Sequence, residues 1–447
     1  MRALLALALL VPLVAGCLSA HSDKTPAAGG PDGSSMAALP KLKFLPPVDL
    51  VCPSEGISQV QNQAQGECGT FGEPVLEVAG DGAIWASATC CVGRSPPIWV
   101  SRDHGQTFQT LPFADRTGVT RDAFGIEGDF AIDDAGNVFF FDIAAATTYF
   151  SKYLADGTHV FTKPDAYPPL VDRPWVRAGV ADEVWNLYNT GTNTNLYHST
   201  NGGLTWSVLP LGFACGLMTF GQGPARSRLF VTGCSGAPQI SISQDGGATF
   251  GAVVTLPVPD LGKKVADLPN GTGTDPFMPP SADEAGNIYV PFTYAADADN
   301  HKQGIWLDIV HPDGTIVGPI LVSGDLGWNE KPWGGAGKDG HYGLAWYGSE
   351  ATRGDGPNAT WNLTVAVTTD GSSDAPHFTM AKPDAEPVLK GDFGRALGDF
   401  LQSDVGPDGR FYVIYAKRVD GPLQNRVVIS DGLDLGPGVP HNGPKPA

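Results

Sequence analysis

One eight-residue pattern occurs three times in this chain and restricts its fold more than any other feature of the sequence. The pattern is Ser-x-Asp/Asn-x-Gly-x-Thr-Phe/Trp. It appears as SRDHGQTF at 101–108, STNGGLTW at 199–206 and SQDGGATF at 243–250. A threefold match of this length indicates that the chain contains internal repeats.

The residue types in this pattern are those of a tight turn between two strands. Oxygens of Asp, Asn, Ser and Thr accept hydrogen bonds from nearby backbone N–H groups, and Gly adopts the positive φ that such a turn needs. The closing aromatic residue is expected to begin an outer strand and to pack against a neighbouring unit. We therefore predict a structural role for Ser101, Asp103, Gly105, Ser199, Asn201, Gly203, Ser243, Asp245 and Gly247.

These turns resemble the Asp-box, or BNR repeat, of sialidase-like β-propellers. The resemblance is specific in the three turns and extends diffusely from about residue 70 to the end of the chain. It implies radial blades of four strands. It also implies that the Asp-boxes lie at the periphery of the blades, away from the pocket that binds ligands.

The rest of the sequence also predicts an all-β fold. Short runs such as NVFFFDI, NIYVPFTY and RFYVIYA alternate with turns rich in Gly, Pro, Asn and Asp. Degenerate versions of the turn begin near residues 151, 310, 368 and 429, and together with recurrent acidic segments they divide the chain into seven units. We predict a β-propeller of seven four-stranded blades, with six blades and a capping element as the alternative.

The N-terminus has the pattern of an exported protein. Arg2 precedes the apolar run ALLALALLVPLVAG, which is too short for a stable membrane span. The run ends in LVAGC, which resembles a prokaryotic lipobox and implies a signal peptide at 1–16 and lipidation of Cys17. An ordinary secretory signal is the alternative. The resemblance predicts a lipid anchor on the outer face of the cytoplasmic membrane or on the cell surface.

The segment 17–50 is rich in Ser, Gly, Pro and Ala and is predicted to be a flexible tether. Residues 51–447 are then predicted to form a single propeller domain. Six cysteines besides Cys17 are an even number, which in an exported chain favours disulfides. Fifteen connectivities exist, and the preferred one joins Cys215 to Cys234 and pairs Cys52 and Cys68 with Cys90 and Cys91.

An acidic residue opens most of the predicted units, often just before Pro or an aromatic residue. In a propeller such residues are expected to ring one mouth of the central channel and to form a concave polar site. Alternatively, each acid caps its own turn. The predicted ligand-binding residues are Glu73, Asp129, Asp172, Asp275, Glu330 and Asp399, with Trp175 and Trp333. We predict no cofactor, and leave open a structural or channel-bound Ca²⁺.

The family resemblance also raises the hypothesis of a sialidase-like exo-glycoside hydrolase. Such enzymes use three arginines, a Tyr nucleophile with a Glu partner and an Asp acid/base. The RIP motif that usually carries their first arginine is absent. The candidate residues for such a site are Arg173, Arg177, Arg228, Arg395, Tyr347 and Glu350. A further acidic stretch at 297–308 has Lys302 where an EF-hand requires Gly, and is predicted to be a solvated loop.

The formal net charge of −19 argues against nucleic acid as a partner, because nucleic-acid binding needs clustered Lys and Arg. Together, the repeated turns, the lipobox-like segment and the acidic residues that open the units predict a monomeric propeller that is anchored to the membrane through lipid. We expect it to bind a glycan, peptide or protein ligand at its channel face. The alternatives are the hydrolase and a structural component of the cell surface.

Overall fold

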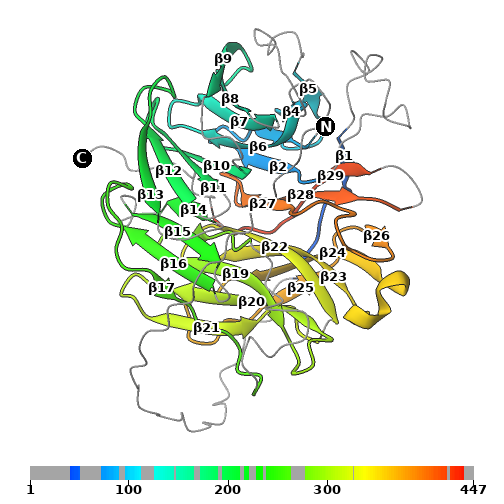
Figure 1. The fold of residues 1–447 in the computed structure, drawn as a ribbon. Helices are drawn as coiled ribbons and strands as arrows, with labels where there is room; N and C mark the ends of the chain where they lie inside the picture. Colours follow the sequence, from blue (N-terminus) through cyan, green and yellow to red (C-terminus); the bar gives the residue numbers. More distant parts are fainter. Residues whose placement is uncertain are drawn as a thin grey trace, which may run out of the picture. The chain divides into compact units, whose positions relative to one another are not determined.

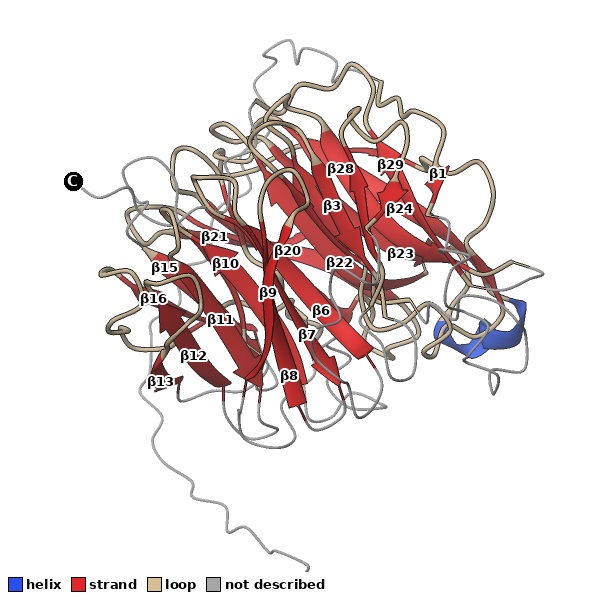
Figure 2. Cartoon of the chain, turned by 90° about the horizontal axis from the view of Figure 1, so that it is seen from above, coloured by secondary structure: helices blue, strands red, loops and turns tan. Residues whose placement is uncertain are grey.

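Strands and turns make up nearly all of the chain that can be described, which confirms the all-β prediction. The computed structural model describes residues 41–50, 72–89, 96–111, 125–144, 147–165, 172–189, 194–211, 216–220, 228–234, 238–262, 277–325, 327–419 and 423–436. Within these ranges the one helical segment is the 3₁₀ helix η5 (Arg353–Asn358), blue in Figure 2. No helix in the same ranges is long and apolar enough to span a membrane.

Five sheets have four strands each and form blades of a β-propeller (Figure 1). The first contains β2 (Val75–Val78), β3 (Ile84–Ser87), β4 (Ile98–Ser101) and β5 (Gln109–Thr110). The second contains β6 (Gly125–Ile132), β7 (Val138–Ala144), β8 (Thr147–Tyr153) and β9 (His159–Asp165). The third contains β10 (Asp172–Ala178), β11 (Val184–Asn189), β12 (Thr194–Ser199) and β13 (Ser207–Leu211). The fourth contains β14 (Leu217–Phe220), β15 (Leu229–Cys234), β16 (Pro238–Ser243) and β17 (Val254–Thr255).

The fifth four-stranded sheet joins strands from the two ends of the described chain. It contains β27 (Gln402–Val405), β28 (Phe411–Lys417) and β29 (Gln424–Ile429), and its outer strand is β1 (Val48–Asp49). An ion pair of 2.6 Å between Arg426 Nε and Asp49 Oδ1 reinforces the β1–β29 pairing. Residues 41–50, which the sequence assigned to the tether, therefore lie against the closing sheet of the propeller.

The predicted count of seven blades is wrong, and so is the alternative of six. The described ranges contain five four-stranded blades, and their remaining strands share one nine-stranded sheet. That sheet contains β18 (Ser281–Ala282), β19 (Ile288–Ala295), β20 (Gln303–Val310), β21 (Ile316–Leu321), β22 (Trp328–Ala336), β23 (Tyr342–Ser349), β24 (Thr360–Thr368), β25 (Thr379–Ala381) and β26 (Leu389–Lys390). The predicted solvated loop at 297–308 is also wrong from residue 303 onward, because β20 begins there.

Two side-chain amides explain how the nine strands come to share one sheet. β20 pairs with β22 in parallel at a single position, Gln303 with Trp328. Beside it, Gln303 Nε2 donates to the Asn329 carbonyl (2.9 Å), and Asn329 Nδ2 donates to the Gln303 carbonyl (2.8 Å). These reciprocal bonds join two runs of antiparallel strands that the sequence had treated as separate units.

The sheets pack against one another through large apolar side chains. Trp206, which closes the second copy of the repeated turn, contacts Phe141 and Phe150 of the preceding blade, each with a centroid separation of 5.5 Å. This confirms the prediction that a closing aromatic packs on a neighbouring unit. A Cβ on Gly203 would lie 1.9 Å from the Phe150 ring, so packing as well as its φ of +82° requires glycine there.

Candidate functional site

Four aromatic rings meet where the inner strands of the propeller converge. Trp175 lies 5.4 Å from Trp333 and 5.3 Å from Phe400, measured between ring centroids, and 6.0 Å from Phe277. Trp175 and Trp333 are only 2 % and 5 % exposed. The structure therefore places these two predicted ligand-binding residues in an apolar cluster that fills the interior between blades.

Asp129 lies inside the same region and connects three inner strands. Its Oδ2 accepts hydrogen bonds from the Val176 N–H (3.0 Å) and from Arg177 Nη1 (3.3 Å), and its Oδ1 accepts one from Gln402 Nε2 (3.3 Å). Burial raises the pKa of Asp129, although the Arg177 guanidinium opposes that shift. Asp129 and Arg177 therefore form a buried ion pair that links β6, β10 and β27.

The other described acids that open the predicted units lie in different places: Glu73 and Asp399 precede β2 and β27, whereas Glu330 lies within β22. Glu73 accepts hydrogen bonds from Arg395 Nη2 and from the Asp399 N–H, both at 3.2 Å, and Arg395 also pairs with Asp399 at 2.7 Å. Glu330 accepts a 2.6 Å hydrogen bond from the indole of Trp328. Asp275 and the side chain of Asp172 lie outside the described residues. The structure thus joins Glu73 to Asp399 through Arg395, while Asp129 belongs to a separate group.

The candidate nucleophile pair of the hydrolase hypothesis is not assembled. The hydroxyl of Tyr347 accepts a hydrogen bond from the Ala416 N–H (2.8 Å) inside the core, where burial raises its pKa. The Glu350 side chain is 81 % exposed and pairs with Lys382 at 3.4 Å. A carboxylate on the surface cannot activate a buried phenol that already serves a backbone amide, so the proposed Tyr347–Glu350 pairing is wrong.

The candidate arginines occupy different surroundings. Arg177 is buried beside Asp129, whereas the Arg395 side chain is 74 % exposed. Arg228 is half-buried and lies immediately before β15. The side chain of Arg173 lies outside the described residues. The three arginines that are described therefore give no sign of a shared carboxylate-binding site.

The three repeated turns use their polar atoms internally. In the first turn, the Ser101 hydroxyl donates to Asp103 Oδ1 (2.8 Å) and accepts from the Gly105 N–H (2.8 Å). The Asp103 carboxylate also accepts from the N–H (2.9 Å) and the hydroxyl (2.6 Å) of Thr107. The turns beginning at Ser199 and Ser243 repeat the bonds from glycine to serine and from threonine N–H to Asn201 or Asp245. Hydrogen bonds from Thr249 and Ser243 lower the pKa of Asp245 to about 2.

The cysteine predictions fall mostly outside the described residues. This holds for Cys17, Cys52, Cys68, Cys90, Cys91 and Cys215, and only the backbone of Cys234 is described, in β15. The pairing and the lipidation remain predictions. Within the described ranges, no group of three or more His, Cys, Asp or Glu side chains is placed to hold a metal ion. The suggested Ca²⁺ therefore receives no support.

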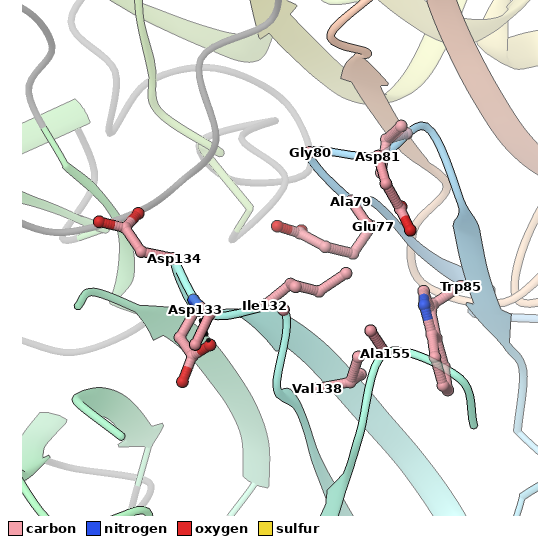
Figure 3. A pocket seen from close by; sticks show the side chains of 13 residues that line it. Glu77, Ala79, Gly80, Asp81, Trp85, Ile132, Asp133, Asp134, Val138 and Ala155 are labelled. Carbon is pink, nitrogen blue, oxygen red and sulfur yellow. Dashed lines mark hydrogen bonds between the residues drawn. The ribbon is translucent and has the colours of Figure 1, made fainter. Parts of the chain in front are cut away.

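A cavity of about 470 Å³ lies between the first two blades, at the turns that follow β2 and β6 (Figure 3). Its lining includes four acidic residues, Glu77, Asp81, Asp133 and Asp134, and no basic residue among those described. Trp85, Ile132 and Val138 supply an apolar wall, while Ala79, Gly80, Ala135, Gly136 and Ala155 leave space because their side chains are small or absent. No pattern in the sequence predicted this site.

One of these acids, Asp133, serves the fold. It accepts hydrogen bonds from the Ala135 and Asn137 N–H groups, from Asn137 Nδ2 and from the Asp182 N–H of the next blade, all at 2.8–2.9 Å. Asp283 does the same in the nine-stranded sheet, reaching Gly340 N–H at 2.9 Å. Both begin a repeated pattern, DDAGN at 133–137 and DEAGN at 283–287. Both segments belong to the recurrent acidic segments of the sequence, but the role of Asp133 and Asp283 in their turns was not predicted.

No protein-family model matches the chain, and no curated protein matches it. Solved structures that are similar include a protein of unknown function from Dyadobacter fermentans, at a TM-score of 0.48 and 12 % identity, covering 88 % of this chain and 100 % of that one. The NanB sialidase from Streptococcus pneumoniae has a TM-score of 0.41 and 13 % identity, covering 81 % and 68 %. The GH74 enzyme of Niastella koreensis has a TM-score of 0.47 and 16 % identity, covering 78 % and 51 %. At these values the similarities carry no argument about what this chain binds or catalyses.

Proposed function

We propose that this chain is an exported, lipid-anchored binding protein whose propeller takes a glycan, peptide or protein ligand at one end of its channel. The observation that carries the proposal is the cavity between the first two blades. Its volume of about 470 Å³ falls within the roughly 300–1,000 Å³ that ligand pockets occupy, and it combines an apolar wall with a few polar groups, as such pockets do.

The aromatic cluster supports this location. Because Trp175, Trp333, Phe277 and Phe400 pack on one another, the interior between the inner strands is filled by side chains. A ligand would therefore bind at an end of the channel, beside the turns. We accordingly place the ligand at the cavity, away from the acids that open the units.

Binding is favoured over hydrolysis because the candidate nucleophile and its partner are separated. Tyr347 is fully buried, and Glu350 is exposed to solvent. The anchor rests on the lipobox-like LVAGC at 13–17. A structural role at the cell surface has no specific observation in its favour.

A cavity-filling substitution tests this function. The full chain is screened on glycan and peptide arrays beside Ala155→Trp, which places an indole in the cavity, and Leu204→Trp, a control in an exposed turn of the third blade. We expect Ala155→Trp to bind the array ligands of the native chain at least tenfold more weakly and to melt at a similar temperature. Leu204→Trp should bind these ligands as the native chain does. Hits that survive in Ala155→Trp would move the site elsewhere, and an absence of hits for the native chain would contradict the binding function.

A further inference from the structure

We infer that the cavity between the first two blades binds an extended peptide through the peptide's own backbone, with an aliphatic side chain buried against the apolar wall. This inference rests on the proposed function and selects one of its ligand classes. The chain itself supplies the precedent, because residues 433–436 are held in this way between two other turns of the same kind.

The turns that follow β2, β6, β10, β18, β22 and β27 each have five residues and share one backbone pattern. In each of them the N–H of the first residue donates to the carbonyl of the fifth, at 2.8–3.1 Å. Residues at the same position of different turns can therefore be compared. We call them the inner turns, and they are 79–83, 133–137, 179–183, 283–287, 337–341 and 406–410.

The second residue of an inner turn donates its N–H to the backbone that lies beside the turn. The Asp134 N–H donates to the Gly179 carbonyl at 3.0 Å, and this bond joins the inner turns after β6 and β10. The Glu284 N–H donates to the Gly337 carbonyl at 3.0 Å, and this bond joins the inner turns after β18 and β22. Neighbouring inner turns thus bond directly at two places in the described ranges.

Between the inner turns after β22 and β27, residues 433–436 take the place of that direct bond. The Lys338 N–H donates to the Leu435 carbonyl at 2.9 Å, and the Leu435 N–H donates to the Gly409 carbonyl at 2.8 Å. A Cβ on Gly337 would lie 2.2 Å from the Leu435 carbonyl oxygen, so the segment lies directly against the turn. A single residue of an extended segment therefore bonds to both turns through its backbone.

The cavity lies in the corresponding gap, between the inner turns after β2 and β6 (Figure 3). Gly80 is the second residue of its turn, as Lys338 is, and Gly136 is the fourth residue of its turn, as Gly409 is. Gly80 and Gly136 both line the cavity. Neither the Gly80 N–H nor the Gly136 carbonyl has a hydrogen-bond partner among the described residues. The donor and the acceptor that hold Leu435 therefore have counterparts in the cavity that a ligand can use.

The apolar wall of the cavity also has a counterpart beside residues 433–436. Leu435 is fully buried, in the same core cluster as Val405 and Phe411, which flank the inner turn after β27. Ile132 and Val138 flank the inner turn after β6 in the same way, and both line the cavity. Extended peptides are commonly recognised by backbone hydrogen bonds together with a pocket for a side chain. An aliphatic side chain is therefore expected at the position that Leu435 has in its own gap.

The first test compares peptides that differ in one group. Calorimetry with the full chain would measure the binding of acetyl-Ala-Leu-Ala-Leu-Gly-Ala-amide, whose second leucine and glycine copy Leu435 and Gly436. We expect N-methylation of that leucine to weaken binding at least tenfold, because the peptide then has no N–H to donate to the Gly136 carbonyl. Serine in place of the same leucine should also bind at least tenfold more weakly, because the apolar contact is lost. Cellohexaose, an oligosaccharide of similar length, should not bind.

The second test removes the donor from the protein. Gly80→Pro deletes the N–H, and the turn after β27 has Pro407 at the same position, so this kind of turn accommodates proline. Gly80→Ala is the matched control, because it keeps the N–H and its Cβ would meet no atom within 4 Å. We expect Gly80→Pro to bind the peptide at least tenfold more weakly and Gly80→Ala to bind it as the native chain does. If Gly80→Pro does not fold, Ala155→Trp, which fills the cavity, should give the same loss.

Three results would overturn the inference: no binding of the peptide to the native chain, equal affinity for the N-methylated peptide, or unchanged binding by folded Gly80→Pro. The last result would place the peptide elsewhere, for instance in the gap that residues 433–436 occupy. These results differ from failure of the proposed function. If Ala155→Trp loses glycan ligands on the arrays while the peptide does not bind, the binding function stands and only the ligand class is wrong.

Discussion

A single buried carboxyl group gives the protein a pH-dependent stability. Asp308 on β20 is completely buried, and neither of its carboxyl oxygens has a hydrogen-bond partner among the described residues. Burial raises its pKa to about 8, so the folded chain holds this group as a neutral acid at pH 7. The unfolded chain would ionise it near pH 4. Its contribution to stability is therefore complete below about pH 4 and is lost as the pH rises towards 8.

Replacing Asp308 with Asn tests whether the titration of this side chain causes the pH dependence of stability. Asn has nearly the same shape and cannot ionise, so the variant should lose stability less steeply with pH. We expect the free energy of unfolding of Asp308→Asn, measured relative to the native chain, to rise by about 1–3 kcal/mol between pH 5 and pH 8. Urea denaturation of both proteins at several pH values measures it. Parallel stability curves for the two proteins would show that Asp308 titrates normally.

At the scale of the element, a turn between first and second strands is held by more hydrogen bonds to its acid than a repeated outer turn is. Asp283 is completely buried and accepts five hydrogen bonds, from the N–H groups of Ala285, Asn287 and Gly340, from Asn287 Nδ2 and from the Tyr289 hydroxyl. One of these crosses from the turn after β18 to the turn after β22. Asp245, in a repeated outer turn, is exposed to solvent and bonds only within its own turn.

We therefore expect Asp283→Ala to lower the free energy of unfolding by about 2–4 kcal/mol, because it leaves buried donors without an acceptor. Asp245→Ala should cost clearly less, because water replaces the carboxylate there. Chemical denaturation of the two variants beside the native chain compares them directly. Equal losses would mean that the bond between adjacent turns adds nothing.

The structure differs from the sequence-based expectations mainly at this scale. Alternating apolar runs and turn residues predicted the strands, and the repeated turns predicted where outer strands begin. Three of the opening acids, Asp129, Asp172 and Glu330, could not be placed because β-bulges lie beside them: the register shifts between Gly125 and Gly128, between Asp172 and Trp175, and between Glu330 and Trp333. A bulge turns the following side chains by one position. The cavity was missed because it combines turns from two blades, which no local pattern reveals.

At the scale of the whole molecule, the predicted lipid on Cys17 decides where the protein is found. Cys17→Ser removes the acceptor thiol, so we expect the variant to leave the membrane fraction for the medium or the aqueous phase. Several acyl chains hold a soluble domain firmly to a bilayer, whereas a single chain binds it only marginally. Fractionation of cells expressing the native chain and the variant measures this. Equal membrane retention would contradict the anchor.

The pairing of β1 with β29 has a consequence for the order in which the chain can fold. Residues 48–49 are synthesised before every other described strand, and their partners at 426–427 are synthesised after all the rest. The other four-stranded blades draw their strands from contiguous stretches and can form before the rest of the chain is available. The closing sheet can form only after all the intervening strands are present. A chain interrupted before β29 would thus carry four blades with an unpaired first strand, open at the seam and exposed to proteases and to other unfinished copies.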